Sequence, residues 1–177
     1  MKIKSLLITI LLLITSSFLM PQAQGATKGW RYWGYFQATP GAHSWNAAMT
    51  GPTVDIADGT VEGWSFVFSS DDVPSQVPTV KPNFAKICSG TKADKDTKRV
   101  GLVIYFGSKA WAPKGETPKK TITTCVRTAK TSQGIDVLNQ VVKIRAATSG
   151  LICGLSGFPA KECGVEIPTP KSLLPKK

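Results

Sequence analysis

Apolar and polar side chains alternate along several short segments of the chain, and glycines and prolines separate these segments. Alternation with a period of two predicts β-strands. In residues 30–37, one face carries Trp30, Tyr32, Gly34 and Phe36, and the other carries Arg31, Trp33, Tyr35 and Gln37. Both faces therefore carry aromatic rings. We expect the first face to point into the core and the second, with Trp33 and Tyr35, to point outward.

Four further segments have strand character: 61–68, 100–106, 121–127 and 143–147. A glycine-rich strand and turn is expected within 150–163. Residues 100–106 form a continuous apolar run, which predicts a central strand buried on both faces.

The period changes over residues 134–142. There Ile135, Leu138, Val141 and Val142 fall on one face of a helix. Residues 84–88 are expected to form a single helical turn. The predicted fold class is α+β: one disulfide-stapled domain with a mostly antiparallel β-sheet and one main helix.

Both ends of the chain differ from the middle. Residues 1–26 have the layout of a secretory signal peptide: Lys2 and Lys4, an apolar stretch, then small residues before a cleavage site at Ala26. A retained membrane anchor is the alternative, but the apolar run is shorter than the ~20 residues of a span. We expect a globular domain over 27–167 and a disordered, basic Pro/Lys tail over 168–177. The predicted location is outside the cell or at the cell envelope.

Four cysteines, Cys88, Cys125, Cys153 and Cys163, follow the leader. An even number of cysteines in an exported chain predicts disulfides. Three pairings are possible. We favour Cys153–Cys163, because glycines and a proline between them allow a sharp turn, and this leaves Cys88–Cys125. No C-x-x-C pair is present and the sole histidine, His43, lies far upstream, so a zinc site is not expected.

Basic residues outnumber acidic ones. The formal net charge is +11, and loss of Lys2 and Lys4 with the leader lowers it to +9. The lysines cluster in loops rich in Pro, Gly and Thr, away from the aromatic run, whereas nucleic-acid binding would interleave the two. A solvated basic surface facing an anionic envelope is the favoured interpretation.

Candidate catalytic groups are sparse. His43 lies beside Ser44, but no G-x-S-x-G elbow surrounds them. Glu62 with Asp71 and Asp72 would be the carboxylates for glycoside hydrolysis, yet the aspartates are adjacent and lie in a polar connection. No phosphate loop or dinucleotide fingerprint is present. We therefore expect a protein that is not an enzyme and that has no cofactor and no metal.

The aromatic segments are the candidate ligand surface, since Trp and Tyr offer rigid, amphipathic area. The alternative is that these rings form the core. Glu62 is either a group that orients a ligand or a charge that protects a sheet edge from association. The candidate ligand-binding residues are Arg31, Trp33, Tyr35, Gln37, Trp45, Glu62 and Trp64.

Several motifs resemble an exported actinobacterial family of unassigned function. They are the Tyr-Trp-Gly-Tyr-Phe run at 32–36, the Val-Glu-Gly-Trp-Ser-Phe run at 61–66, Gly-Leu-Ile-Cys at 150–153, Phe-Pro-Ala at 158–160 and Cys-Gly at 163–164. The resemblance spans nearly the whole chain after the leader and implies no particular activity.

A weaker resemblance is to transcobalamin-like C-terminal domains. The aromatic motif at 32–36 with 61–64 is similar to their closing half, and 124–126 with 134–138 to their opening half, in swapped order. Such domains cover corrinoids, so this resemblance implies a corrinoid-like ligand.

Together these features predict a secreted, non-catalytic binding protein, an accessory in the capture of a vitamin-like small molecule for an envelope uptake system. Its partners would be that ligand and a transporter component, with no nucleic acid. The alternative is a cell-envelope protein that binds anionic wall polymers through its basic loops. Oligomeric state stays open.

Overall fold

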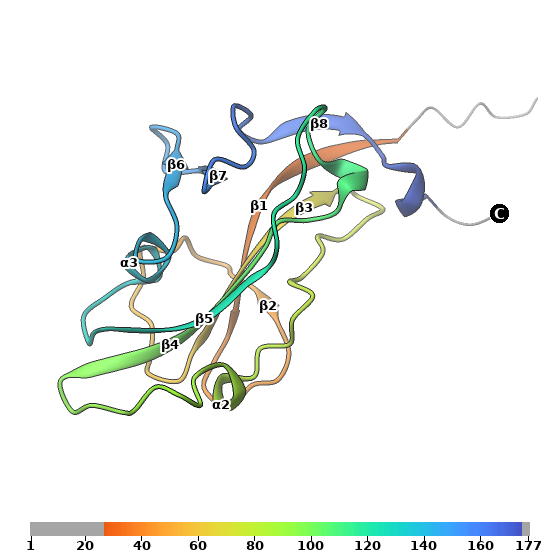
Figure 1. Cartoon of the computed structure of the whole chain (residues 1–177). Helices are drawn as coiled ribbons and strands as arrows, with labels where there is room; N and C mark the ends of the chain where they lie inside the picture. The colour runs from red at the N-terminus through yellow and green to blue at the C-terminus, as the bar shows by residue number, and fades with distance from the viewer. Residues whose placement is uncertain (1–26, 175–177) are drawn as a thin grey trace, which may run out of the picture.

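The computed structural model describes residues 27–174, so the predicted signal peptide lies outside the described residues. A six-stranded sheet with the order β2-β1-β3-β4-β5 forms the body of the protein, and β8 extends it by pairing with β1 (Figure 1). The strands of this sheet are β1 (Lys28–Ala38), β2 (Asn46–Ala47), β3 (Val61–Ser69), β4 (Thr97–Tyr105), β5 (Ile122–Ala129) and β8 (Val165–Pro168).

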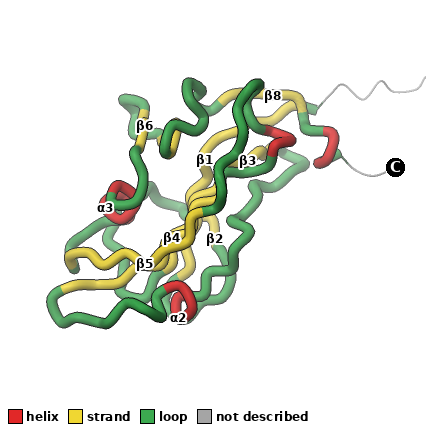
Figure 2. Tube along the Cα trace, viewed as in Figure 1, coloured by secondary structure: helices red, strands yellow, loops and turns green. Residues whose placement is uncertain are grey.

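The remaining elements are short. A two-stranded hairpin combines β6 (Ile144–Ala146) with β7 (Ile152–Leu155). The helices are α2 (Phe84–Ile87), α3 (Gly134–Asn139) and the 3₁₀ turns η1 (Lys109–Trp111) and η2 (Lys171–Leu173). Loops make up much of the chain (Figure 2). The prediction of one α+β domain is confirmed.

Sheet topology is mixed at its centre. β3 and β4 pair in parallel, whereas β1–β2, β1–β3, β1–β8, β4–β5 and β6–β7 pair antiparallel. A parallel pair needs a crossover connection. Residues 70–96, which include α2, provide it. The β4 strand is almost wholly buried, as its continuous apolar sequence predicted.

The face assignment of β1 was wrong for Trp30, Trp33 and Tyr35, whereas Phe36, which was placed inward, is buried. Trp33 lies opposite Phe66, and Tyr35 lies opposite Trp64, so all four rings share the face that packs into the main core. Trp33 is 4% exposed, whereas Trp30 on the other face is 54% exposed. Alternation identified which residues share a face. It did not identify the core face, because that depends on the large rings that β3 contributes.

A second, smaller cluster covers the other face of the sheet. Ala38, Val61 and Val103 are buried there beneath Trp45 and residues of the crossover. A Cβ added at Gly63 would lie 2.6 Å from the Trp45 ring, so glycine lets the indole pack directly on the strand. Trp45 therefore lies on the opposite face of the sheet from Trp33 and Trp64.

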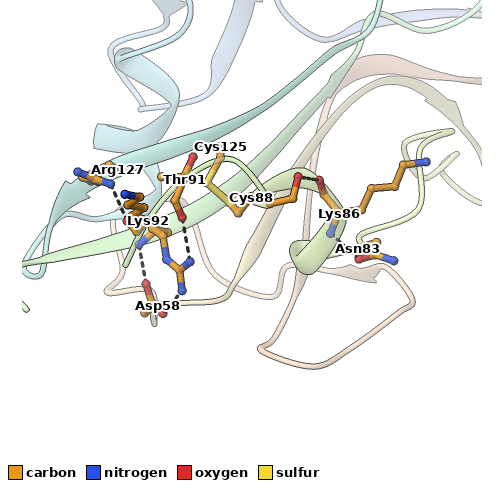
Figure 3. Close-up of a disulfide and its surroundings, with 10 residues drawn as sticks. Asp58, Asn83, Lys86, Cys88, Thr91, Lys92, Cys125 and Arg127 are labelled. Atoms are coloured by element: carbon orange, nitrogen blue, oxygen red, sulfur yellow. Dashed lines mark hydrogen bonds and ion pairs between the residues drawn. A yellow bond between two sulfur atoms is a disulfide. The ribbon is translucent and has the colours of Figure 1, made fainter. Parts of the chain in front are cut away.

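Both disulfides form as favoured from the sequence: Cys88–Cys125 and Cys153–Cys163. The first joins the end of α2 to β5 (Figure 3). In the chain-entropy view a bridge of this span stabilises the fold by about 4 kcal/mol. Two disulfides are typical of proteins in an oxidising, extracytoplasmic setting. Within residues 27–174, the helices are all too short or too polar to cross a membrane.

The C-terminal segment, for which a disordered tail was expected from Pro168, is described up to Leu174 and contains η2. Pro168 ends β8, Pro170 is buried, and the Thr169 amide donates to the Thr27 carbonyl, which ties the two ends of the described chain together.

The main helix is shorter than the 134–142 that periodicity predicted. It begins at Gly134, and the Asp136 carboxylate caps its first turn by accepting a hydrogen bond from the Gln133 amide at 2.8 Å. Val137 and Leu138 are fully buried. After Asn139 the chain leaves the helix, yet Val142 still reaches the core.

Candidate functional site

A buried carboxyl group lies on the core face of the sheet. Gln37 is opposite Glu62 across β1 and β3, and Tyr35 is two residues away on the same face. The Tyr35 hydroxyl donates to Glu62 Oε2, and Gln37 Nε2 donates to Glu62 Oε1 at 2.9 Å and to Tyr35 Oη at 2.7 Å. Glu62 is 0% exposed. We call these three residues the carboxyl cluster.

Burial controls the electrostatics of the carboxyl cluster. Removal from water raises the pKa of Glu62, and hydrogen bonds from Tyr35 and Gln37 and the charge of Lys98 offset part of that rise. Burial, and then the neighbouring Glu62 charge, raise the pKa of Tyr35 above its ordinary value. The interpretation of Glu62 as an edge charge was wrong, because β3 lies between β1 and β4 inside the sheet.

Lys98 is a buried cation on the same face of the sheet. Its Nζ donates to the carbonyl of Ile56 and to that of Ser132, each at 2.6 Å. Ser132 in turn shares a 2.6 Å hydrogen bond with Thr128. A buried charge needs such partners. Lys98 thereby holds together the loop before β3 and the turn before α3.

The start of α3 covers the carboxyl cluster. A Cβ added at Gly134 would lie 2.7 Å from Tyr35 Oη and 2.8 Å from Glu62 Oε2, so a side chain has no room there. The Ile135 amide donates to the Pro52 carbonyl at 2.8 Å and joins the loop to the helix. Glu62 is thus enclosed by backbone.

A concave site lies on the outer side of this cover. A cavity of about 450 Å³ opens between the loop at 51–53, α3, and the β6–β7 hairpin. We call it the hairpin pocket. Its lining residues are Gly51, Pro52, Thr53, Ile135, Asn139, Ile144, Ala146, Ser149, Gly150 and Ile152. Gly134, next to Ile135, separates it from Glu62, so the carboxyl group lies behind the pocket wall.

A second hollow, of about 410 Å³, lies at the N-terminal half of β1. We call it the Trp30 hollow. Its lining residues are Trp30, Tyr32, Ser69, Leu151, Cys163 and Gly164.

The candidate ligand residues are dispersed. Tyr35, Gln37 and Glu62 come together in the carboxyl cluster, and Trp64 stacks on Tyr35 with ring centroids 4.7 Å apart. Trp45 lies on the other face of the sheet. None of the seven candidates lines either cavity.

Two of the candidates, Arg31 and Trp33, contact the segments that follow β4. Arg31 pairs with Glu162 and donates to the carbonyls of Trp111 and Ala112 at 3.3 and 3.2 Å. Trp33 Nε1 donates to the Phe158 carbonyl at 3.1 Å. These contacts attach the C-terminal segment to the sheet.

Sequence reasoning missed Lys98, Gly134 and the hairpin pocket. One feature of the sequence could have drawn attention to Lys98. It lies two residues before the apolar run at 100–106, and alternation places it on the same face of that strand as Val100 and Leu102. The hairpin pocket had no such feature, because its walls come from three separate segments.

The residues considered for metal binding or catalysis can be placed in the described part of the chain. Residues 27–174 hold no group of three or more His, Cys, Asp or Glu side chains arranged for a metal ion. His43 is exposed in a loop before β2.

Comparison with known proteins gives a family and no closer relative. No curated protein and no solved structure matches the chain. A family model described as the SCO2322-like domain matches residues 25–168. This agrees with the resemblance to a family of unassigned function, and the likeness to transcobalamin-like domains stays a prediction. Because the match covers most of its length, the chain belongs to the SCO2322-like domain family.

Proposed function

We propose that this protein is an extracytoplasmic, non-catalytic binding protein that holds a small, uncharged and mainly apolar molecule in the hairpin pocket. The single observation that carries the proposal is the pocket itself. Ligand sites are concave, mostly apolar cavities of roughly 300–1,000 Å³ with a few polar groups. The hairpin pocket, at about 450 Å³, falls in that range.

The lining of the pocket suits an uncharged ligand. Its apolar wall is made of Pro52, Ile135, Ile144 and Ile152, and no lining residue carries a charge. Hydroxyl and amide groups of Thr53, Asn139 and Ser149 are available to orient a guest. A charged ligand would lose its hydration here without gaining a partner of opposite sign.

The pocket walls are held in place before any ligand arrives. Pro52 and Ile135 are joined by a backbone hydrogen bond. Arg145, on β6, donates through Nη2 to the carbonyls of Cys153, Pro159 and Glu162 at 3.2, 2.9 and 2.7 Å. A pocket that is already ordered loses less entropy on binding.

We extend the proposal to a role in capture for small-molecule uptake, as the transcobalamin-like resemblance implies. A corrinoid is much larger than a molecule that a cavity of about 450 Å³ encloses. If the ligand is corrinoid-like, the pocket would bind only one substituent or one edge of the ring system.

The test uses N-phenyl-1-naphthylamine, an uncharged dye whose fluorescence rises in apolar surroundings. Ala146→Trp places a large ring at the pocket mouth and is expected to abolish the rise. The matched control is Ala47→Trp, on the exposed strand β2 outside both cavities, which is expected to leave it unchanged. Equal dye binding by both variants would remove the support for this site.

The second candidate function is binding of anionic wall polymers. One specific observation favours it: Lys92 and Arg127 lie together beside the Cys88–Cys125 disulfide, with Lys86 on the other side of that bond (Figure 3). Binding of this kind weakens steeply as salt screens the charges. Retention on immobilised polyphosphate that is lost in Lys92→Gln/Arg127→Gln would support it, whereas dye binding in the hairpin pocket is expected to tolerate salt.

A further inference from the structure

Trp30 departs from the other tryptophans of the chain. Trp33, Trp64 and Trp111 are 4%, 2% and 6% exposed, and Trp45 is partly buried against Gly63. Trp30 is 54% exposed, although it lies within a strand that is paired on both edges. Leaving an indole in water forgoes the stabilisation that its burial would bring.

The exposed indole belongs to a shaped surface. Trp30 and Tyr32 are two residues apart on β1, so their rings project from the same face. Ser69, opposite Trp30 on β3, shares a 3.1 Å hydrogen bond with the Tyr32 hydroxyl. Leu151, which is 45% exposed, forms another part of the lining. The result is the Trp30 hollow, of about 410 Å³.

The hollow is rigid. Trp30 projects from β1, which pairs with β3 on one edge and β8 on the other. The wall of the hollow at Cys163 is bonded to Cys153, and the preceding residue, Glu162, is ion-paired with Arg31. Rings presented on such a scaffold lose little entropy when a ligand stacks on them.

The chemistry of the lining selects the ligand class. It offers the faces of an indole and a phenol, with two hydroxyl groups beside them, and no charged side chain. Lys28 and Glu166 lie in the strand pairing next to Trp30, but they pair with one another at 3.1 Å. An ion of either sign therefore finds no unpaired partner there.

We propose that the Trp30 hollow binds a neutral saccharide, whose apolar C–H face stacks on Trp30 while its hydroxyl groups exchange hydrogen bonds with Tyr32 and Ser69. A pyranose ring has this combination of one apolar face and a hydroxyl-bearing edge. Tyr32 and Ser69 already share one hydrogen bond, and a hydrocarbon chain would leave their remaining hydrogen-bonding capacity unused. This site is independent of the hairpin pocket.

The test is a titration of the purified protein with glucose, mannose, galactose and N-acetylglucosamine and with a trisaccharide of each. The readout is the NMR signal of each tryptophan indole N–H. We expect at least one trisaccharide to shift the Trp30 signal in a saturable way while the Trp33 and Trp64 signals stay in place. Because Trp30 is exposed, Trp30→Ala should remain folded and should weaken binding by about tenfold or more.

Controls separate this site from other apolar surface. Trp30→Phe keeps a ring and should retain part of the affinity. Met49→Ala, at a residue 94% exposed elsewhere, and Ala146→Trp, in the hairpin pocket, should leave saccharide binding unchanged. The proposal is overturned if no sugar of the panel shifts the Trp30 signal, if Trp30→Ala binds the sugar as well as the original protein, or if the uncharged naphthylamine dye alone occupies the hollow.

Discussion

Trp30 and Trp33 lie three residues apart on one strand, and their surroundings have little in common. Trp33 packs against Phe66 and Phe106, with ring centroids 5.6 and 5.4 Å away, and its indole nitrogen has a hydrogen-bond partner. Trp30 faces a hollow that no other part of the described chain fills. The strand therefore uses one face to build the core and leaves part of the other available for contact.

The two faces also differ in how they treat polar groups. The core face carries the enclosed carboxyl cluster and the buried Lys98, each with hydrogen-bond partners. Near the Trp30 hollow, the other face leaves Tyr32 and Ser69 only partly buried, although Ser65 further along β3 is 0% exposed. A buried polar group that is fully paired fixes one arrangement of its neighbours, since any displacement leaves it unsatisfied. We therefore assign structural roles to the core face and binding roles to the surface hollows.

The largest difference between the faces should appear on truncating the two indoles. Trp33→Ala removes a buried ring and is expected to lower the free energy of unfolding by about 3–5 kcal/mol. Trp30→Ala removes a half-exposed ring and should cost less than about 1 kcal/mol. Urea unfolding followed by circular dichroism measures both. Similar losses for the two variants would contradict the division of the strand into a core face and an accessible face.

Glycine substitutions give the next comparison. Gly134→Ala forces a methyl group against the enclosed Tyr35–Glu62 pair and should destabilise the protein by about 1–3 kcal/mol, despite the better helix propensity of alanine. Gly63→Ala presses instead on the Trp45 ring, which is partly exposed. It should cost less. A larger loss at Gly63, by the same urea measurement, would mean that the smaller cluster is the more tightly packed one.

Much of this architecture could be predicted from local sequence. Alternation located β1 and β3, the apolar run at 100–106 located β4, and turn residues between Cys153 and Cys163 favoured the correct disulfides. These features depend on residues that are close in sequence, so periodicity and turn chemistry suffice.

The choice of core face could not be predicted in the same way. Trp33 is buried because the register with β3 places it beside Phe66, and the C-terminal segment then covers both rings through Phe158. The burial of Glu62 could not be predicted from the sequence, because a strand at the edge of a sheet and a strand inside it can have the same alternating pattern. The order of strands, which the parallel β3–β4 pair establishes, decides that question.

The buried carboxyl group should make stability depend on pH. Because burial raises the pKa of Glu62 in the folded state, the folded protein holds this proton more tightly than the unfolded chain, for which 4.5 is the ordinary value. The contribution of Glu62 to stability is then fully present below about pH 4.5 and is lost as pH rises through the higher folded pKa.

Urea unfolding at a series of pH values checks this dependence. Glu62→Gln cannot ionise, so the free energy of unfolding should fall less between pH 4.5 and 8 in this variant than in the original protein. The matched control is Glu166→Gln, whose carboxylate is exposed beside Lys28 and should leave the slope nearly unchanged. A slope that Glu62→Gln leaves intact would assign the pH dependence to other groups.

The smallest expected effect concerns the ion pair at the rim of the Trp30 hollow. The side chains of Lys28 and Glu166 are 63% and 47% exposed, so water screens their attraction, and Lys28→Met should change the free energy of unfolding by less than about 0.5 kcal/mol. Arg31, three residues further along β1, pairs with Glu162, and their side chains are 11% and 27% exposed. Arg31 also donates hydrogen bonds to two carbonyl groups. Arg31→Met should therefore cost several times more than Lys28→Met, and only the Lys28 effect should vanish in 1 M salt. Equal losses in the two variants would show that the core face and the accessible face of β1 hold their charges equally firmly, which would undo the distinction on which the binding role of the Trp30 hollow depends.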